Sequence, residues 1–487
     1  MSLTNKLKNA GYWQTLQTLI TIISQFAYLG VMARLLSKAD YGLMAIAGGF
    51  IGIGTIFSEG GMSAALIQRK NITQKHMNAA LQGGILFGLL FFFLLFFLAK
   101  YIAVFFHQPE LTLLTKVIGV NIILNSVSGI SMGLLEKYFR FNKTAIVTMA
   151  SSIIGYVVGI VLAFHNYGVW SLVFATLTTS ILNTIGFFYY APVRFSLNVN
   201  IKEWKELFSF GSGILLLKTA NFFSDRGINL ILGKVITSDL LGVFERTSKI
   251  KLLPSSYIGK ILDTIMFPAM SEIQDEHERL FRIYQQSLGM VNSLLMPISV
   301  FLICFSKEIV LILLGNGWEE AVLPLQIMFV VLPFSSSGRM ADMVIRAKGL
   351  IYKNVVRKYI YVTVLISTTA LGAYFYGVTG AAIGVTFSFL FNYVIMLFLV
   401  KRIFKKPITE IFLKPVVEGS KLTGFVLLII FVLNTLLNNW EQTTILNFLI
   451  ISCIIAGIIL IIVWKKPSLL GHYLYLTISQ LFFNKKK

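Results

Sequence analysis

Long apolar runs alternate with short polar segments along the whole chain. A membrane-spanning helix needs about 20 predominantly apolar residues, and the runs predict fourteen such helices. The predicted spans are Tyr12–Ala33, Tyr41–Ile67, Ala79–Phe106, Leu111–Leu135, Thr144–Phe164, Val169–Tyr190, Leu207–Leu232, Leu240–Met270, Phe281–Phe305, Ala321–Ala347, Val355–Phe375, Val378–Val400, Leu422–Leu437 and Thr443–Trp464. A β-barrel would instead show short segments of alternating polarity. The pattern therefore predicts an all-α polytopic membrane protein.

Composition agrees with this class. Charged residues make up 13% of the chain and its mean hydropathy is +0.78, whereas a soluble domain carries about a quarter charged residues. Most of the 42 Lys and Arg residues lie in alternate loops, which places both termini in the cytoplasm by the positive-inside rule. The net charge of +21 thus reflects topology and attraction to anionic membrane lipid, and it does not indicate a nucleic-acid partner.

Cysteine and histidine point to no catalytic or metal site. The two cysteines, Cys304 and Cys453, both fall inside apolar runs, so no disulfide framework or CxxC metal site is possible. The five histidines all fall in or beside predicted loops. We therefore expect neither a catalytic residue nor a bound metal or other cofactor.

Two sequence signatures recur at matched spacing. Arg34–Gly42 resembles Lys234–Gly242, each with a cation, a short acidic turn, and a glycine eight residues after the cation. Tyr-Gly-Val occurs at residues 167–169 and 376–378, each time with an Asn about fifteen residues later. The offsets correspond to about six helices. An even number of spans per repeat gives two parallel halves with a site between them.

The predicted domain organisation follows from this repeat. Residues 1–190 form the first six-helix repeat, and residues 191–206 form a cytoplasmic linker. Residues 207–402 form the second repeat. Residues 403–487 add two further helices and a basic cytoplasmic tail.

Ionisable side chains recur inside the predicted spans. Each costs about 2.5–3.5 kcal/mol at a helix centre, so it must face a bundle interior or a wet cavity. The basic ones are Lys218, Arg226, Arg246, Lys249, Lys251, Lys260 and Arg339, and the acidic ones are Glu59, Asp225, Glu245, Asp263 and Asp342. In the seventh span, Lys218, Asn221, Asp225 and Asn229 follow one helical face. The small positive excess favours a cationic cavity for an anionic cargo, because Arg and Lys hold phosphate well.

A purely structural interpretation stays open for some of these charges. Glu245–Lys249, Lys260–Asp263 and Arg339–Asp342 are neighbours on their helices. They could neutralise one another and merely hold helices together.

The chain resembles the polysaccharide exporters of the multidrug/oligosaccharidyl-lipid/polysaccharide superfamily, and within them the Wzx-type flippases that export colanic or teichuronic acid. The segments that carry the resemblance are Ala33–Gly42, Phe57–Lys70, Asn221 with Asp225 and Arg226, Leu232–Lys234, Leu241–Gly242, Lys249 with Pro254, and Phe267–Ala269 with Ser271. The sequence departs from the family pattern at Lys249, where Arg is usual, and at Glu245, Arg246 and Lys251, where charge is uncommon.

The resemblance implies a MATE-like fold and a bacterial inner-membrane flippase. Such a protein moves an undecaprenyl-diphosphate-linked oligosaccharide to the outer leaflet by alternating access. The sugar-diphosphate would enter a cavity lined by Lys218, Asn221, Arg226, Arg246, Lys249, Lys260 and Arg339. Coupling to an H⁺ or Na⁺ gradient would use Glu59, Asp225 or Asp342. We further expect a monomer that cooperates with polysaccharide polymerase machinery.

Two other functions compete with this interpretation. A cation-coupled drug or metabolite antiporter of the same superfamily would favour an acidic cavity, which the positive excess opposes. A membrane glycosyl-polymerase or acyltransferase would need an intramembrane His or a large outer loop, and every predicted outer loop is short.

Overall fold

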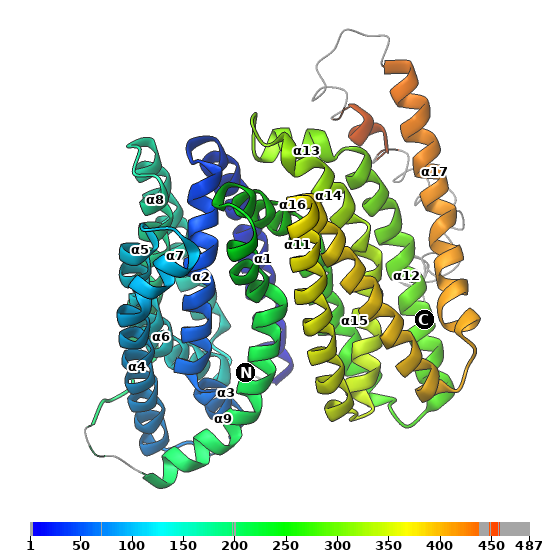
Figure 1. The fold of residues 1–487 in the computed structure, drawn as a ribbon. Helices are drawn as coiled ribbons and strands as arrows, with labels where there is room; N and C mark the ends of the chain where they lie inside the picture. Colours follow the sequence, from blue (N-terminus) through cyan, green and yellow to red (C-terminus); the bar gives the residue numbers. More distant parts are fainter. Residues whose placement is uncertain are drawn as a thin grey trace. The chain divides into compact units, whose positions relative to one another are not determined.

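The computed structural model describes residues 3–69, 71–196, 198, 201–437, 448, 450–455 and 457 (Figure 1). These residues form helices joined by short turns, with no strand among them. The chain divides into two compact units, Met1–Glu245 and Arg246–Lys487, and the boundary falls inside one long helix, α11 (Ser238–Glu272). The predicted all-α fold is confirmed.

The first unit is a helical bundle in which α2 and α6 contact each other and both contact α4 and α8, and α7 packs between α1 and α8. Its elements before α11 are α1 (Leu3–Leu35), α2 (Lys38–Glu59), α3 (Met62–Gln68), α4 (Gln74–Phe106), α5 (Leu111–Ile118), α6 (Val120–Lys137), α7 (Phe141–Phe164), α8 (Val169–Tyr190), α9 (Ile201–Phe222), a π-helical turn η1 (Phe223–Gly227) and α10 (Ile228–Val235).

The second unit packs α12 against α15 and α17, and α15 against α16. After α11 it contains α12 (His277–Cys304), α13 (Ser306–Leu313), a 3₁₀ turn η2 (Glu319–Ala321), α14 (Val322–Phe329), α15 (Val331–Ala347), α16 (Ile351–Phe404), a π-helical turn η3 (Thr409–Leu413) and α17 (Lys414–Leu437). Its apolar core gathers around Tyr284, Leu288, Met340 and Val344.

Ten helical stretches of the described residues are long and apolar enough to cross a membrane. One of them, Asn354–Phe404, contains the turn at Gly377 and so corresponds to two predicted spans. The charged stretches of α9–α10 and α11 are not among the ten. The last predicted span, Thr443–Trp464, lies mostly outside the described residues. The number fourteen is consistent with this structure and stays a prediction.

The predicted span Tyr41–Ile67 is divided at Gly60 and Gly61 into α2 and α3. Three further predicted spans are not continuous α-helices. Leu111–Leu135 is divided at Gly119, a residue of low helix propensity, into α5 and α6. Ala321–Ala347 is divided at Val330, because Pro333 has no N–H to donate to the Phe329 carbonyl. The third, Leu207–Leu232, contains the π-helical turn η1.

The recurring Tyr-Gly-Val segments form the same tight turn. Gly168 has φ 52° and ψ −133°, and Gly377 has φ 56° and ψ −137°. This left-handed backbone conformation is readily adopted only by glycine. Both turns lie where the sequence predicts them.

The other recurring signature, at Arg34–Gly42 and Lys234–Gly242, lies where the starts of α2 and α11 make a close contact. Ser37 and Asp40 form a capping box at the start of α2. A Cβ added at Gly42 would collide with the Ser238 carbonyl oxygen at the start of α11, and one added at Gly242 would collide with the Lys38 carbonyl oxygen. Each glycine therefore makes room for the backbone of the other segment, which is how small residues let membrane helices approach.

This contact predicts that Gly42→Ala lowers stability by about 1–3 kcal/mol, the usual cost of overpacking. Gly48→Ala in the same helix is the matched control, because a Cβ there meets nothing within 4 Å. Thermal unfolding of the purified protein compares the two variants. Equal melting temperatures would show that the Gly42 contact is not tight.

Candidate functional site

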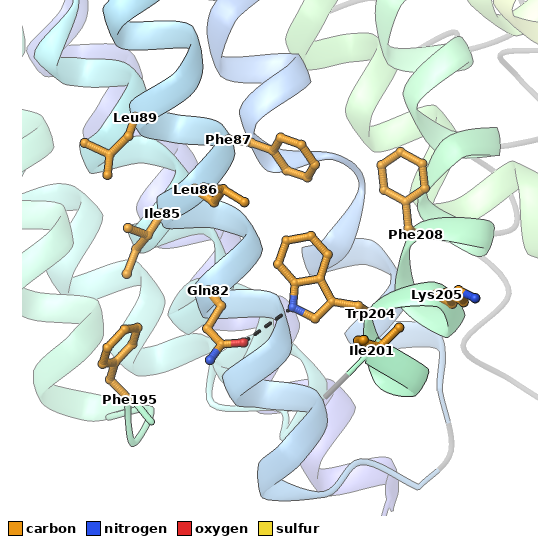
Figure 2. Close-up of a pocket in the computed structure, with 10 residues that line it drawn as sticks. All are labelled: Gln82, Ile85, Leu86, Phe87, Leu89, Phe195, Ile201, Trp204, Lys205 and Phe208. Atoms are coloured by element: carbon orange, nitrogen blue, oxygen red, sulfur yellow. Dashed lines mark hydrogen bonds between the residues drawn. The ribbon is translucent and has the colours of Figure 1, made fainter. Parts of the chain in front are cut away.

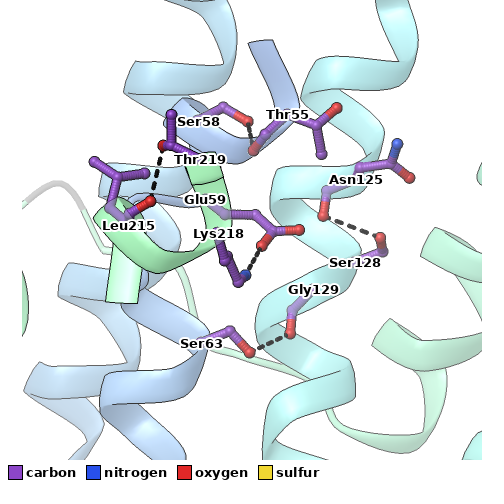
Figure 3. A network of polar contacts seen from close by, with 10 residues as sticks. All are labelled: Thr55, Ser58, Glu59, Ser63, Asn125, Ser128, Gly129, Leu215, Lys218 and Thr219. Atoms are coloured by element: carbon purple, nitrogen blue, oxygen red, sulfur yellow. Dashed lines mark hydrogen bonds and ion pairs between the residues drawn. The ribbon is translucent and has the colours of Figure 1, made fainter. Parts of the chain in front are cut away.

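A carboxylate and an ammonium group meet where α2 ends. Glu59 Oε2 lies 2.5 Å from Lys218 Nζ of α9, a residue 159 positions away in the chain (Figure 3). Both side chains were predicted site residues, but the sequence did not predict that they pair. Their exposed fractions, 23% for Glu59 and 37% for Lys218, leave the pair within reach of a ligand.

The local sequence places Glu59 at this point. Gly60 and Gly61 both have positive φ, so α2 stops at Glu59 and α3 starts directly afterwards. A carboxylate at a helix C-terminus is opposed by the helix dipole, and Lys218 offsets that opposition. On its other side Glu59 faces Gly129 of α6, where an added Cβ would lie 3.7 Å from Glu59 Oε1. Ser63 fixes α3 to α6 by donating a hydrogen bond to the Gly129 carbonyl, 2.9 Å.

The same helix crossing in the second unit carries the opposite charge. Glu59 is residue 22 of α2, and Gly259 is residue 22 of α11. The guanidinium of Arg339 on α15 lies directly over Gly259, where an added Cβ would collide with it. Thus one crossing holds an acid beside Gly129, and the other holds a base beside Gly259. Gly129 and Arg339 each stand ten residues before the left-handed residue that ends their helix, Phe139 or Gly349.

The π-helical turn η1 changes the predicted polar stripe of the seventh span. Lys218 and Asn221 lie on regular α-helix, but Asp225 and Arg226 lie within η1. A π-helical turn adds a residue to the turn, so the three-and-four spacing that predicted one continuous face does not hold beyond Phe222. Asp225 and Arg226 are both exposed, whereas Asn221 is half-buried. π-Helical turns occur often at functional sites.

The charged residues of α11 differ in their surroundings. Arg246 is buried, and Lys249 is exposed. Lys251 is buried with its ammonium 4.1 Å from the ring centroid of Phe389 on α16, a cation–π contact. The side chains of Lys260 and Asp263 lie outside the described residues. Whether all the polar faces converge on one central cavity stays a prediction.

Asp342 is the centre of a polar cluster in the second unit. Its carboxylate accepts a hydrogen bond from Asn354 at 2.8 Å and lies 2.8 Å from Arg346 Nε and 3.5 Å from an Arg357 nitrogen. Arg357 also donates to the side-chain oxygens of Asn354 and Asn392. Its side chain is only 8% exposed, so the cluster fixes a guanidinium inside the bundle.

The structure gives Asp342 ion-pair partners that the sequence interpretation did not name. The sequence left open a neutralising Arg339–Asp342 pair on one helix. The structure shows Asp342 paired with Arg346 and Arg357. The sequence interpretation did not include Asn354 or Arg357 among the site residues. The recurrence of Asn183 at Asn392 was a signal for this region, because Asn392 accepts a hydrogen bond from Arg357.

In the first unit, the positions that correspond to this polar cluster are occupied by apolar side chains. Helices α6 and α15 end in the same hydrogen-bond pattern, with Arg140 N–H donating to Leu135 O and Leu350 N–H donating to Ile345 O. In that register Asp342 corresponds to Met132 and Arg357 to Val147. Met132 and Val147 belong to one apolar cluster with Leu135 and Phe187. The backbone arrangement therefore does not require charge here.

Within the described residues, no group of three or more His, Cys, Asp or Glu side chains could hold a metal ion. The chemistry of the described polar clusters is that of charge pairing and hydrogen bonding. Such clusters can bind a polar or charged ligand.

Comparison with known proteins identifies relatives across most of the chain. Residues 31–323 match the family described as polysaccharide biosynthesis protein. The lipopolysaccharide biosynthesis protein WzxC of Escherichia coli K12 is 22% identical over 84% of this chain and 82% of its own. The teichuronic acid biosynthesis protein TuaB of Bacillus subtilis is 21% identical over 68% and 69%. The succinoglycan biosynthesis transport protein ExoT of Rhizobium meliloti is 22% identical over 64% and 63%.

Solved structures share the fold. The lipid II flippase MurJ, in an inward closed conformation, has a TM-score of 0.74 over 96% of this chain and 99% of its own, at 18% identity. An inward-facing multidrug resistance transporter of the MATE family has a TM-score of 0.61 over 80% and 94%, at 16% identity. These likenesses confirm the predicted MATE-like fold. The relatives are a polysaccharide biosynthesis protein and a biosynthesis transport protein, which agrees with the expectation that the chain is not an enzyme.

The comparison of the two units gives a stability test. Asp342→Met alone leaves Arg357 without its carboxylate, and breaking a buried pair costs about 3–5 kcal/mol. Asp342→Met combined with Arg357→Val copies the first unit, and we expect it to recover most of that loss. Thermal unfolding of the single and double variants measures the interaction. A double variant no more stable than Asp342→Met would show that the two places are not equivalent.

Proposed function

Because the chain belongs to the family of polysaccharide biosynthesis proteins, we propose that it flips an undecaprenyl-diphosphate-linked oligosaccharide repeat unit across a bacterial inner membrane. The glycan then serves the synthesis of a surface polysaccharide. The observation that carries this proposal is the family match over residues 31–323. That match includes the Glu59–Lys218 pair, η1 and α11 with its charged residues.

The charges of the spans support an anionic cargo. A diphosphate is a strong hydrogen-bond acceptor with fixed negative charge, and Lys and Arg bind it through charge-assisted hydrogen bonds. Lys218 is partly exposed and Arg226 is exposed, so both can reach a head group. The polyprenyl tail would stay in the lipid.

The Glu59–Lys218 pair suggests how binding is linked to a change of state. A diphosphate competes with Glu59 for the Lys218 ammonium. A carboxylate that loses its cation in a low-dielectric site is costly unless it takes up another cation, which an H⁺ or Na⁺ gradient supplies. Release of Lys218 frees α9, whose next turn is the π-helical η1. In this scheme Glu59 is the first coupling carboxylate, and Asp225 and Asp342 are further candidates.

A deletion strain tests the proposed function directly. We expect lipid-linked oligosaccharide to accumulate on the cytoplasmic side and surface polysaccharide to be lost, because no other step removes the unflipped intermediate. Extraction and mass analysis of the lipid fraction measure the intermediate. Drug efflux that depends on the protein, without such accumulation, would favour the antiporter instead.

Lys218→Ala or Arg226→Ala should abolish surface polysaccharide while protein levels stay normal, because each removes a cation that binds the diphosphate. Lys116→Ala is the control, since Lys116 lies on α5 beside Phe96, with its ammonium 4.6 Å from the ring centroid. Normal export by both variants would contradict the cationic site.

The exchanged pair Glu59→Lys with Lys218→Glu separates the two roles of this contact. It restores an ion pair between α2 and α9, so the melting temperature should return toward that of the native protein. Export should still fail, because the cation now lies on the wrong helix. Full export by the exchanged variant would show that the pair only holds the helices together.

A further inference from the structure

A groove of about 950 Å³ runs along the first unit between α4 and the start of α9 (Figure 2). Phe87 of α4 forms one wall, and Trp204 and Phe208 of α9 form the other. Phe195, from the segment before α9, also lines it. Gln82 and Lys205 are its only polar lining residues in the described part of the chain.

The groove is open on a side formed by exposed apolar side chains. Its lining residues Leu86 and Ile201 are more than half exposed. The same face of α4 continues outward through exposed Phe93 and Phe97. A face of this kind is stable only against hydrocarbon. The groove therefore accepts an alkyl chain.

The start of α9 has the features of a membrane interface. Trp204 donates its indole N–H to the Gln82 side-chain oxygen at 3.4 Å, with its ring turned into the groove (Figure 2). Tryptophan prefers the headgroup level of a bilayer. Lys202 and Lys205 are both exposed one turn apart, and Lys205 lies at the rim. The positive-inside rule places this end on the cytoplasmic side, where the leaflet is anionic.

Glu206, the acidic residue that follows Lys205, is already paired within the protein. Glu206 lies on the other face of α9, 2.6 Å from Arg69 and 3.4 Å from His76. The hydrogen bond with His76, and then the Arg69 guanidinium, lower the pKa of the Glu206 carboxyl. Its charge is thus compensated mainly by Arg69 and His76, and Lys202 adds a smaller Coulombic attraction.

We propose that this groove binds an anionic phospholipid of the cytoplasmic leaflet, with an acyl chain along Phe87, Trp204 and Phe208 and its phosphate at Lys202 and Lys205. The bound lipid acts as a wedge between α4 and α9. It steadies the start of the helix that carries Lys218, so the lipid composition sets how firmly α9 is held. This site lies apart from the Glu59–Lys218 pair and does not depend on the identity of the cargo.

Tryptophan quenching by brominated lipid tests the site in the full-length protein. A variant with Trp13, Trp170, Trp318, Trp440 and Trp464 changed to Phe reports on Trp204 alone. In phosphatidylcholine vesicles, brominated phosphatidylglycerol should quench Trp204 at lower mole fraction than brominated phosphatidylcholine does. Lys202→Gln and Lys205→Gln should each weaken this preference about fivefold, the effect of one basic side chain at an anionic surface.

Lys100→Gln, at the opposite end of α4, is the matched control and should leave the preference unchanged. Equal quenching by both lipids, or none by either, would overturn the proposal. Relief of quenching by a polyprenyl phosphate at lower mole fraction than by unbrominated phosphatidylglycerol would also overturn it, and would assign the groove to a polyprenyl chain. If the multiple variant does not fold, the difference between the native protein and Trp204→Phe supplies the same measurement.

Discussion

A charge inside the hydrocarbon region must have a counter-charge or contact with water, and the polar architecture of both units depends on this constraint. In the first unit it joins Glu59 at the end of α2 to Lys218 on α9. In the second it gathers Arg346 and Arg357 around Asp342. A pair that is half open to a ligand can exchange partners, whereas a cluster around a buried guanidinium is fixed. The same constraint therefore gives an exchangeable ion pair in the first unit and a fixed polar cluster in the second.

The two units also show which features the fold itself needs. Both carry the left-handed glycine before a helix, at Gly168 and Gly377, and within the first unit Gly42 and Gly242 each make room for the backbone of the other's segment. These shared features belong to the scaffold. The charges are not shared, since Met132 and Val147 stand where Asp342 and Arg357 stand. Charge that a common backbone does not require is best explained by function.

Helix α9 connects these observations. Its first turn is held by Glu206 on one face and borders the apolar groove on the other. Its last turns carry Lys218 and lead into the π-helical turn η1. The start of α9 is held by the Glu206–Arg69 ion pair, and its end leads into η1. Movement of the helix between these points requires the Glu59–Lys218 ion pair to break. If both proposals hold, α9 is the element through which cargo charge and membrane lipid act.

The sequence by itself determined the membrane class, most helix boundaries, the tight glycine turns and the inventory of charged residues in the spans. These follow from hydropathy and helical spacing, which are local properties of the chain. Only the tertiary structure decided the partners: Lys218 with Glu59, and Asp342 with Arg346 and Arg357. It also revealed η1 and the groove at Trp204. Partners on different helices depend on how those helices pack, and spacing within one helix carries no information about that packing.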